Sequence, residues 1–448
     1  MYGRQNKNVM TFFSDFPEGH SRHAIAVISF FVVFTLFKLP LLSCTTAHAE
    51  KNNTNNSNGI GIMLTNDKGK ILFSENPDQK FIPASTLKIL TSLEALHFLG
   101  KNFRFKTVFF LDKQFNLKIK GYGDPFFTSE VIKAICKRLF LILQQKKIFK
   151  INSIILDDTF FASPLNIPGT GESSNPYDAS VGALCANFNT VFFTHDRARE
   201  KIISAEPQTP ILPFTEKRIK ASGLHQGRII LSKNESRIYA GLLIKYFLKL
   251  QGIHLACDTS QVGNSKIKQD CGIKTGSVSA EDEKILTWKS PYTLKDIIQK
   301  LLRYSNNFTA NQIFLRTGAE RCASPASLYK GVNTLKNYAE NNLGIKKIEI
   351  AEGSGLSRKN RITPREMIKL LFAFMPYHDL MRKKYTENKI KLEEFYKTGT
   401  LKDVRTRAGY FRINNGRLYP YVIMVNNKKC SYELIKNKLE KIVTKDAE

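Results

Sequence analysis

The sequence predicts an α/β (α+β) protein whose main domain is assembled from both ends of the chain around an inserted middle segment. A β-hairpin and a helix come early, at residues 60–74 and 83–99, whereas helices and a three-stranded β-meander fill the last third. Between them lies a mosaic of short β-like runs and loops. We therefore expect one domain at 59–105 and 281–448, with an antiparallel sheet flanked by helices, and a mostly β insertion of one or two small domains at 106–280.

The early elements have clear local signals. Two short apolar runs, at 60–65 and 70–74, flank Asp67-Lys68-Gly69, whose Asp and Gly supply the backbone conformations of a hairpin turn. From Pro83 onward the apolar residues recur three and four positions apart, as on one face of a helix, and Gly100 closes the pattern.

The late elements are also marked at their ends. Three helices are predicted by start signals at Thr293, at Ser324-Pro325 and at Thr363-Pro364, where a capping side chain or a proline suits a first helical turn. After Leu392 the pattern becomes β again. The three expected strands of the meander are 395–401, 404–413 and 418–425.

The first 58 residues have the layout of a secretory signal followed by a linker. A basic flank precedes a short apolar stretch, and Ala47-His48-Ala49 is a small-x-small cleavage pattern. The next residues are polar and lack aromatic side chains. We therefore expect a signal segment at 1–49, a linker at 50–58, and a protein exported to the periplasm or cell envelope.

The apolar stretch also leaves an anchored form open. It is shorter than the roughly 20 residues that a helix needs to cross a bilayer. Membrane association through residues 24–42 is expected only if the signal is not cleaved. Leu41-Leu42-Ser43-Cys44 loosely resembles a lipoprotein processing site, so a lipid anchor on Cys44 is a further alternative.

The composition limits which partners and cofactors are expected. The 68 Lys and Arg against 39 Asp and Glu give a net charge of +29, which favours anionic partners, although solvated faces account for such an excess equally well. Export argues against nucleic acid as a partner. Seven cysteines are present, and their pairing cannot be read from the sequence. No C-x-x-C motif or Cys/His cluster occurs, so we expect no metal site.

Three short motifs stand in order along the chain: Ser85-Thr86-Leu87-Lys88, Ser305-Asn306-Asn307 and Lys397-Thr398-Gly399. In its general form this set is that of β-lactamases and penicillin-binding proteins, whose serine forms an acyl-enzyme. Each motif alone is a weak signal, because the chain contains three S-x-x-K matches and two K-T-G matches. The residues around each match must therefore decide which matches belong to a catalytic site.

Ser85 has the best surroundings of the three candidate serines. It follows Pro83 at a predicted helix start, where free backbone N–H groups can stabilise an oxyanion. Lys88 lies one turn further on the same face, beside a predicted buried surface, where desolvation favours a neutral amine that can act as a base. Ser327 lies in an amphipathic helix and Ser265 in a charged loop, so neither has this environment.

The K-T-G match at 397 is favoured over the one at Lys274, which lies in loop-like sequence and is interpreted as a coincidence. Residues 397–399 fall within the predicted meander, where a strand edge can pair with an extended peptide. Gly399 allows a close approach of the substrate backbone. Lys397 can attract a terminal carboxylate, which Thr398 or Thr400 can hydrogen-bond.

Ser305 and Asn307 are expected on the turn after the helix that begins at Thr293. Ser305 can relay protons between Lys88 or Lys397 and a leaving amine, and Asn307 can hold Lys88 and the substrate amide. Alone, Ser and Asn in such a place are ordinary turn residues. The two other motifs are what favours the catalytic interpretation.

The segment Pro83–Ser92 resembles the nucleophile segment of the D-alanyl-D-alanine carboxypeptidase/endopeptidase family of low-molecular-mass class C penicillin-binding proteins. Three further stretches fit that family in order: Gly121–Pro125, Glu352–Arg358 and Tyr396–Leu401. Ser305–Asn311 is similar to its second motif. The resemblance covers most of the mature chain and implies a β-lactamase/transpeptidase-like domain interrupted by two small inserted domains.

The resemblance also implies a function. Ser85 would attack the penultimate D-alanine of peptidoglycan stem peptides with Lys88 as the base, and the N–H groups of Ser85 and Thr400 would form the oxyanion hole. Lys397 and Thr398 would hold the terminal carboxylate. We therefore expect a serine-type D-Ala-D-Ala carboxypeptidase, with or without DD-endopeptidase activity, that β-lactams acylate on Ser85 and that needs no metal or organic cofactor.

Some features depart from the pattern. Asn306 stands where the family usually has Asp, which puts the local hydrogen bonding in doubt, and Tyr304-Ser305-Asn306 also fits the Tyr-x-Asn of a different β-lactamase class. Two alternatives follow: a β-lactamase, or a catalytically inactive peptidoglycan-binding envelope protein. The turn at Glu352–Arg358 is interpreted as structural, and Asp157 as an ordinary strand-end carboxylate.

Overall fold

The structure, a computed structural model, describes residues 59–171, 176–196, 201–231, 233–258, 271–385, 392–414, 416–426 and 432–447. The expected signal segment (1–49), linker (50–58) and apolar segment (24–42) lie outside these described residues. Within the described ranges, no helix combines the length and the apolar composition that crossing a membrane requires.

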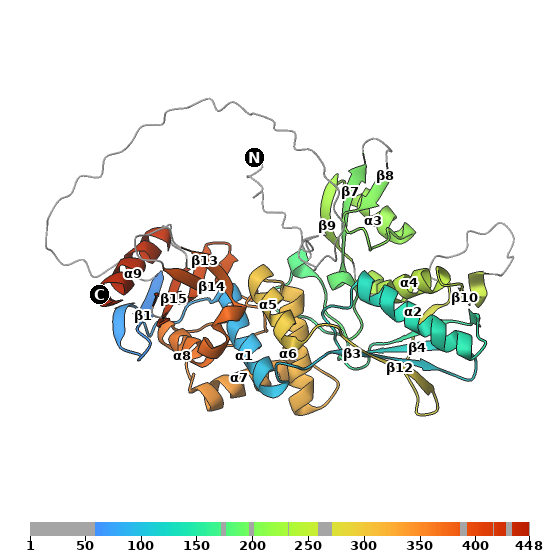
Figure 1. Ribbon diagram of the computed structural model, residues 1–448, viewed down its shortest axis with the longest axis horizontal. Coiled ribbons are helices and arrows are strands. Elements are labelled where there is room, and N and C mark those ends of the chain that lie inside the picture. The colour runs from blue at the N-terminus through green and yellow to red at the C-terminus, as the bar shows by residue number, and fades with distance from the viewer. Residues whose placement is uncertain are drawn as a thin grey trace, which may run out of the picture. The chain divides into compact units, whose positions relative to one another are not determined.

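The main sheet joins the two ends of the chain (Figure 1). In sheet order its six strands are β13 (Arg382–Tyr385), β14 (Glu393–Leu401), β15 (Val404–Arg412), β16 (Leu418–Asn426), β1 (Ile60–Thr65) and β2 (Ile71–Glu75). All neighbours pair antiparallel, and β1 meets β16 with Ile62 opposite Ile423. The predicted sheet of an early hairpin and a late meander is therefore confirmed.

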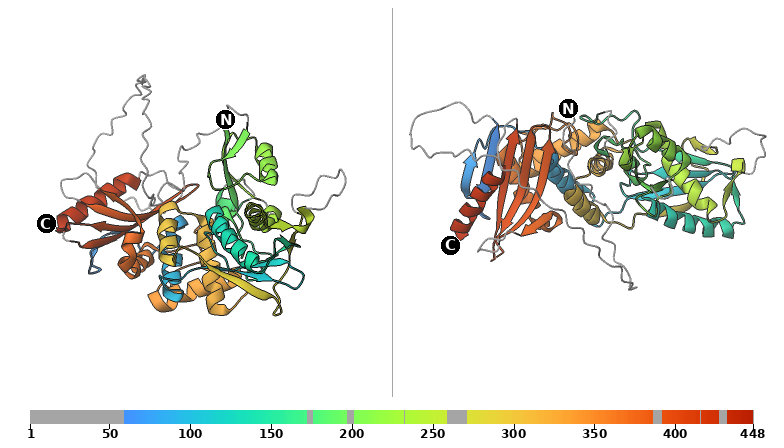
Figure 2. Two further views of the ribbon diagram at one scale, coloured as in Figure 1. Left: turned by 45° about the vertical axis from the view of Figure 1, so that its right-hand side comes forward. Right: turned by 90° about the horizontal axis from the view of Figure 1, so that it is seen from above.

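Helices cover both faces of this sheet. On one face, α9 (Tyr432–Ala447) shares an apolar cluster with Phe411. The hydroxyl of the neighbouring Tyr410 donates a 2.5 Å hydrogen bond to the Leu371 carbonyl of α8 (Pro364–Phe374). Because neighbouring residues of a strand point to opposite faces, these contacts place α8 and α9 on opposite sides of the sheet. Figure 2 shows the sheet from two further directions.

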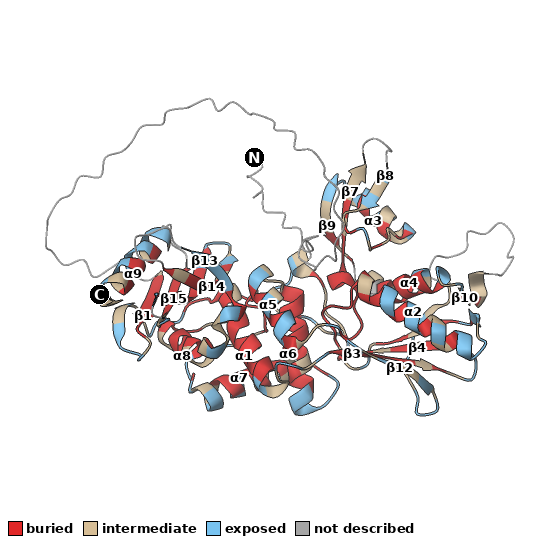
Figure 3. Ribbon diagram, viewed as in Figure 1, coloured by how far each residue is buried: buried red, intermediate tan, exposed pale blue. Residues whose placement is uncertain are grey.

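The next layer is built around α1 (Lys88–Phe98), which follows the short 3-10 turn η1 (Ala84–Leu87). Residues 88–96 of α1 are all buried, as the red ribbon in Figure 3 shows. The helices α5 (Leu294–Tyr304) and α6 (Asn307–Cys322) pack against it. The enclosed position explains the broad apolar surface of this segment, although the polar Thr91, Ser92 and Glu94 are buried along with it.

Two of the three predicted helix starts are confirmed and one is wrong. Thr293 caps α5 and Thr363 caps α8 through their side chains. The third helix, α7 (Leu328–Asn337), is capped by Ser327 and not by Ser324, because the Ser327 hydroxyl accepts a free backbone N–H of the first turn. The remaining short helical turns are η2 (Pro176–Asp178), η3 (Asn187–Asn189), η4 (Ala256–Asp258), η5 (Tyr338–Asn342) and η6 (Met375–Leu380).

The inserted segment contains more helix than the mostly β character that we expected. Its described residues form the helices α2 (Ser129–Gln145), α3 (Pro213–Ser222) and α4 (Lys233–Lys249). A five-stranded sheet has the order β11 (Ile273–Thr275), β6 (Ile154–Asp157), β4 (Leu117–Gly121), β3 (Lys106–Leu111) and β12 (Glu283–Lys289). Two smaller sheets are β8 (Lys201–Ser204), β7 (Thr190–Asp196) and β9 (Gln226–Ile230), and β10 (His254–Leu255) with β5 (Lys150–Ile151).

The five-stranded sheet extends beyond the boundary that we expected at residue 280. Its edge strand β12 pairs antiparallel with β3, with Trp288 opposite Thr107. The inserted sheet therefore continues to Lys289. The sequence did not reveal this strand because it lacks a buried apolar face: its residues are exposed or half-exposed throughout.

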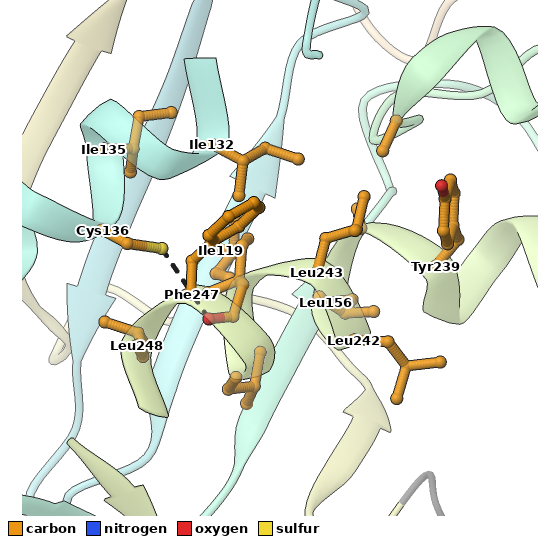
Figure 4. Close-up of a cluster of buried hydrophobic side chains, with 14 of the residues drawn as sticks. Ile119, Ile132, Ile135, Cys136, Leu156, Tyr239, Leu242, Leu243, Phe247 and Leu248 are labelled. Atoms are coloured by element: carbon orange, nitrogen blue, oxygen red, sulfur yellow. Dashed lines mark hydrogen bonds between the residues drawn. The ribbon is translucent and has the colours of Figure 1, made fainter. Parts of the chain in front are cut away.

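The core of the inserted segment lies between α2, α4 and the five-stranded sheet (Figure 4). Ile132 of α2, Phe247 of α4 and Ile119 of β4 belong to one buried cluster. The Cys136 thiol of α2 lies 3.7 Å from the Ile244 carbonyl of α4, which joins the two helices directly. Burial and this contact account for an unpaired Cys136 in the core.

The structure also resolves part of the cysteine pairing that the sequence left open. Cys257 and Cys271 form a disulfide. Of the other described cysteines, Cys136 and Cys185 are buried free thiols and Cys322 is an exposed one. Burial raises the pKa of Cys185 to about 12, so this thiol stays protonated and unreactive at neutral pH.

Candidate active site

Ser85 lies in a tight turn whose backbone is held from two sides. The preceding Ala84 is buried and has a φ of 47°, in the left-handed region. The Pro83 carbonyl accepts hydrogen bonds of 2.7 Å from the hydroxyls of Thr86 and of Thr406 on β15. The turn is therefore fixed to the sheet, while Ser85 itself remains partly exposed.

The Lys88 amine joins three parts of the site. Lys88 is 0% exposed, and its Nζ lies 2.8 Å from Ser85 Oγ, 2.7 Å from Asn307 Oδ1 and 2.6 Å from the Ser354 carbonyl oxygen. Burial lowers the pKa of Lys88 to about 7, because loss of water disfavours the ammonium, and the charge of Glu352 opposes this shift. The neutral amine is therefore well populated near neutral pH.

A neutral Lys88 fits its three partners in one way. A neutral amine has two N–H donors and one lone pair. The Asn307 oxygen and the Ser354 carbonyl can only accept, so both N–H groups are directed to them. The lone pair is then left for the hydroxyl of Ser85. This is the geometry that a general base needs toward a serine nucleophile.

Ser305, Asn306 and Asn307 form the junction between α5 and α6. Ser305 ends α5 in the left-handed conformation, with a φ of 62°, and Asn306 is the N-cap of α6. The chain therefore turns sharply between the two helices. Asn307, at the first position of α6, is buried and reaches Lys88, while the Ser305 hydroxyl faces Lys397.

Asn306 makes the helix cap that an Asp at the same position would also make. Its side-chain oxygen accepts a 2.8 Å hydrogen bond from the Thr309 N–H. We expect Asn306→Ala to lower the free energy of unfolding by about 1 kcal/mol, since the cap is lost. Asn306→Asp keeps the acceptor and adds a charge that suits a helix N-terminus, so its stability should equal or exceed that of the wild type. Denaturant unfolding measures both, and an equal loss in the two variants would contradict the capping role.

Lys397 is the second buried amine of the site. It is 2% exposed, and its Nζ donates 2.7 Å hydrogen bonds to Ser305 Oγ and to the Thr398 carbonyl. Burial holds the pKa of Lys397 well below its usual range, and the charges of Lys88 and Arg382 act in the same direction. The two amines therefore disfavour carrying protons at the same time.

Gly399 brings β14 against the nucleophile turn. A Cβ at this position would lie 2.8 Å from both the Ser85 nitrogen and the Pro83 oxygen, closer than a side chain tolerates. Among the described residues, the neighbouring strand β13 pairs with residues 393–396 and no strand pairs with 397–401 on that side, so this stretch has one open edge there. Thr398 is half-exposed and Thr400 is exposed on this stretch. An extended peptide can therefore add to β14 beside Ser85.

The other motif matches lie elsewhere. Ser327 is the N-cap of α7, which explains its spacing to Lys330 as a helix start. Lys274 is on β11 of the inserted sheet, paired with Ile155, and so lies on a strand where we had interpreted a loop. Ser265 lies outside the described residues.

The sequence did not predict that the turn after Glu352 would touch the lysine. We interpreted this turn as structural, yet its Ser354 carbonyl is one of the three partners of Lys88. A main-chain oxygen has no signature in a sequence. The glycines on either side, Gly353 and Gly355, were the available signal that the backbone here approaches other groups closely. Asp157 is an acceptor for Lys120 at 3.1 Å, as an ordinary strand-end carboxylate would be.

Comparisons with known proteins point to one family. The model of the D-Ala-D-Ala carboxypeptidase 3 (S13) family matches residues 45–380. The D-alanyl-D-alanine carboxypeptidase DacB of Haemophilus influenzae is 22% identical over 444 residues, which cover 88% of this chain and 91% of that protein. The penicillin-sensitive carboxypeptidase A of Dictyostelium discoideum is 25% identical over 349 residues, which cover 67% of this chain and 65% of that protein.

A solved structure shows the same fold. The crystal structure of penicillin binding protein 4 (dacB) from Haemophilus influenzae matches with a TM-score of 0.65 at 20% identity, over 83% of this chain and 91% of that one. The expected fold class is thereby confirmed. The family match ends before Lys397, so the place of that residue in the site comes from the contacts described above. Since the match spans three quarters of the sequence, the resemblance is also confirmed, and the chain belongs to the D-Ala-D-Ala carboxypeptidase 3 (S13) family.

Proposed function

We propose that this protein is a serine-type D-alanyl-D-alanine carboxypeptidase, which acts on peptidoglycan stem peptides through an acyl-enzyme on Ser85. The observation that carries the proposal is the 2.8 Å contact between the buried Lys88 amine and the Ser85 hydroxyl. A second amine, Lys397, joins the same site through Ser305. A nucleophile, a base and a cation for the terminal carboxylate are the groups that this hydrolysis requires.

In the acylation step, Ser85 Oγ attacks the carbonyl carbon of the penultimate D-alanine, and Lys88 takes the hydroxyl proton. The N–H groups of Ser85 and Thr400 stabilise the developing oxyanion. When the C–N bond breaks, the proton passes from Lys88 through the Ser305 hydroxyl to the nitrogen of the leaving D-alanine. Water then hydrolyses the ester with Lys88 again as the base, and the shortened peptide leaves.

Lys397 and the open edge of β14 recognise the substrate. A bound terminal carboxylate supplies a negative charge that favours the ammonium form of Lys397, and so offsets the burial that lowers its pKa. Thr398 and Thr400 donate hydrogen bonds to the carboxylate, and Gly399 leaves space for the peptide backbone. β-Lactams carry a comparable carboxylate beside a reactive amide, so they acylate Ser85 by the same first step.

Two further assignments go with this function. We propose that residues 59–105 and 281–448, apart from β12, form the catalytic domain, and that the segment between them forms the inserted domains. We also propose that the protein is exported to the periplasm or cell envelope, where peptidoglycan lies. The secretory layout of residues 1–49 supports this location, and residues 24–42 add membrane association only in an uncleaved chain.

Mass spectrometry of muropeptides tests the function. After incubation with the purified protein, we expect pentapeptides that end in D-Ala-D-Ala to lose one D-alanine. Conversion of cross-linked dimers to monomers would add DD-endopeptidase activity. Intact pentapeptides in the presence of folded protein would contradict the proposal. Faster turnover of penicillin than of peptide would favour a β-lactamase, and unlabelled protein that still pellets with peptidoglycan would favour a non-catalytic binding protein.

A further inference from the structure

The turn at residues 352–360 encloses a buried acid. Glu352 is 0% exposed, and its oxygens accept hydrogen bonds from the Ser354 N–H at 2.7 Å, the Ser354 hydroxyl at 2.6 Å, the Ser357 N–H at 3.2 Å and the Asn360 side-chain amide at 2.8 Å. Every one of these partners can donate, which is the pattern that a carboxylate requires. No ion pair involves Glu352 among the described residues. A buried carboxylate without a paired cation is costly, so its presence here calls for a function.

This turn lies directly behind the catalytic groups. The Ser354 carbonyl accepts a 2.6 Å hydrogen bond from Lys88. Gly355 has a φ of 81°, and a Cβ there would lie 1.8 Å from the Ala84 oxygen and 3.1 Å from the Ser85 nitrogen. The turn therefore contacts both the base and the backbone of the nucleophile, and a displacement of the turn would shift both groups.

The main chain alone does not fix the Ser354 carbonyl. Ser354 is flanked by Gly353 and Gly355, the residue type with the widest choice of backbone angles. One oxygen of Glu352 binds both the N–H and the hydroxyl of Ser354 and so holds this residue at two points. The other oxygen binds Ser357 and Asn360 further along the turn. Gly353 is held by Asn311 at its N–H and by Thr91 at its carbonyl, and Glu352 holds the next residue, Ser354. Glu352 thus helps to set the direction in which the Ser354 carbonyl points.

We propose that Glu352 is a positioning residue, which holds Ser354 so that its carbonyl takes one N–H of Lys88 and leaves the Lys88 lone pair aimed at Ser85. Glu352 acts through Ser354 and does not itself meet the substrate. The inference rests on the proposed roles of Ser85 and Lys88 as nucleophile and base. Glu352 has a second effect, since its negative charge favours the ammonium form and raises the pH at which Lys88 becomes neutral.

The test compares Glu352→Gln with Glu352→Asp in acylation by a fluorescent penicillin across pH. In Glu352→Gln we expect acylation at the high-pH plateau to be about 10- to 100-fold slower, because a small misplacement of a catalytic group has effects of this size. The midpoint of the pH profile should move to lower pH, since the charge that favoured the ammonium is gone. Glu352→Asp keeps the charge, so its midpoint should return to the wild-type value. A purely structural role would reduce the amount of folded protein without slowing acylation by the folded fraction at the plateau.

A direct titration of the Lys88 amine measures its midpoint without relying on enzyme activity. The Lys88 side chain is followed by carbon-13 NMR in lysine-labelled protein and assigned by its absence in Lys88→Arg. We expect its midpoint near pH 7 in the wild type and lower in Glu352→Gln. Glu440→Gln is the matched control, because Glu440 is also buried but lies on α9, paired with Lys436 at 2.6 Å, and should leave the midpoint unchanged. Absence of acylation in the wild type would overturn the proposed function alone, whereas an unmoved acylation plateau in folded Glu352→Gln would overturn this inference, even if the midpoint moved.

Discussion

The Ser85→Ala variant is expected to lose covalent labelling by fluorescent penicillin entirely and to release D-alanine at least about 10⁴-fold more slowly than the wild type. Among the described residues, the Ser85 hydroxyl is the one side-chain hydroxyl that is hydrogen-bonded to Lys88, so no neighbour can replace the nucleophile. The fold should persist, because Ser85 is partly exposed and its backbone is held through Pro83 and Thr406. Gel fluorescence after labelling and a D-alanine assay measure the two losses.

A matched control uses the other described serine of an S-x-x-K pattern. Ser327→Asp removes a hydroxyl that also precedes a lysine by three positions, but it retains an acceptor for the N-cap of α7. This variant should be labelled and should release D-alanine at the wild-type rate. Labelling that persisted in Ser85→Ala, or that disappeared in Ser327→Asp, would show that the nucleophile is not Ser85.

The sequence predicted the side chains of the site better than it predicted their backbone partners. Motif and surroundings predict Ser85, Lys88 and Asn307 as site residues. In the structure Lys88 Nζ lies 2.8 Å from Ser85 Oγ and 2.7 Å from Asn307 Oδ1. The helix start at Pro83 and the apolar residues after Lys88 already implied a buried amine beside a free serine. Side-chain chemistry depends on residue type, and helical spacing depends on sequence position, so one sequence is enough to predict both.

The contacts that the sequence did not reveal depend on the tertiary fold. The Ser354 carbonyl is a main-chain atom, and Glu352 reaches it only because the turn folds back on itself. The edge strand β12 has no buried face. Its sequence therefore shows no alternation of apolar and polar residues from which its pairing with β3 could be predicted. Such features need the partner surface to be known before the residues can be interpreted.

Removing the amine of Lys88 should have the second-largest effect. Lys88→Met keeps a long apolar side chain in the buried space but provides no proton acceptor. We expect acylation by penicillin to be about 10²- to 10⁴-fold slower, the range that a positioned general base contributes. The measurement is the second-order rate constant for labelling, with Ser85 unchanged. A loss of less than about tenfold would mean that another group takes the serine proton.

The pH dependence of acylation follows from the same amine. Only the neutral form of Lys88 has a lone pair for the Ser85 proton, and its pKa is about 7 in the fold. The wild-type rate should therefore rise with pH through about 7 and then level off. Lys88→Met should show no such rise, because it has no group to deprotonate. A wild-type rate that was flat between pH 5 and pH 9 would contradict the assignment of Lys88 as the base.

Stability should reveal the same titration without any substrate. Lys88 has a pKa of about 7 in the fold, against 10.5 for an ordinary lysine. Between these values the unfolded chain binds a proton that the folded chain lacks, so the free energy of unfolding rises with pH, by at most about 1.4 kcal/mol per pH unit. Lys88→Met lacks this contribution, so its stability relative to the wild type should fall as the pH increases from 7 to 10. Parallel curves for the two proteins would mean that Lys88 stays charged in the fold, and the lone pair on which acylation depends would then be absent.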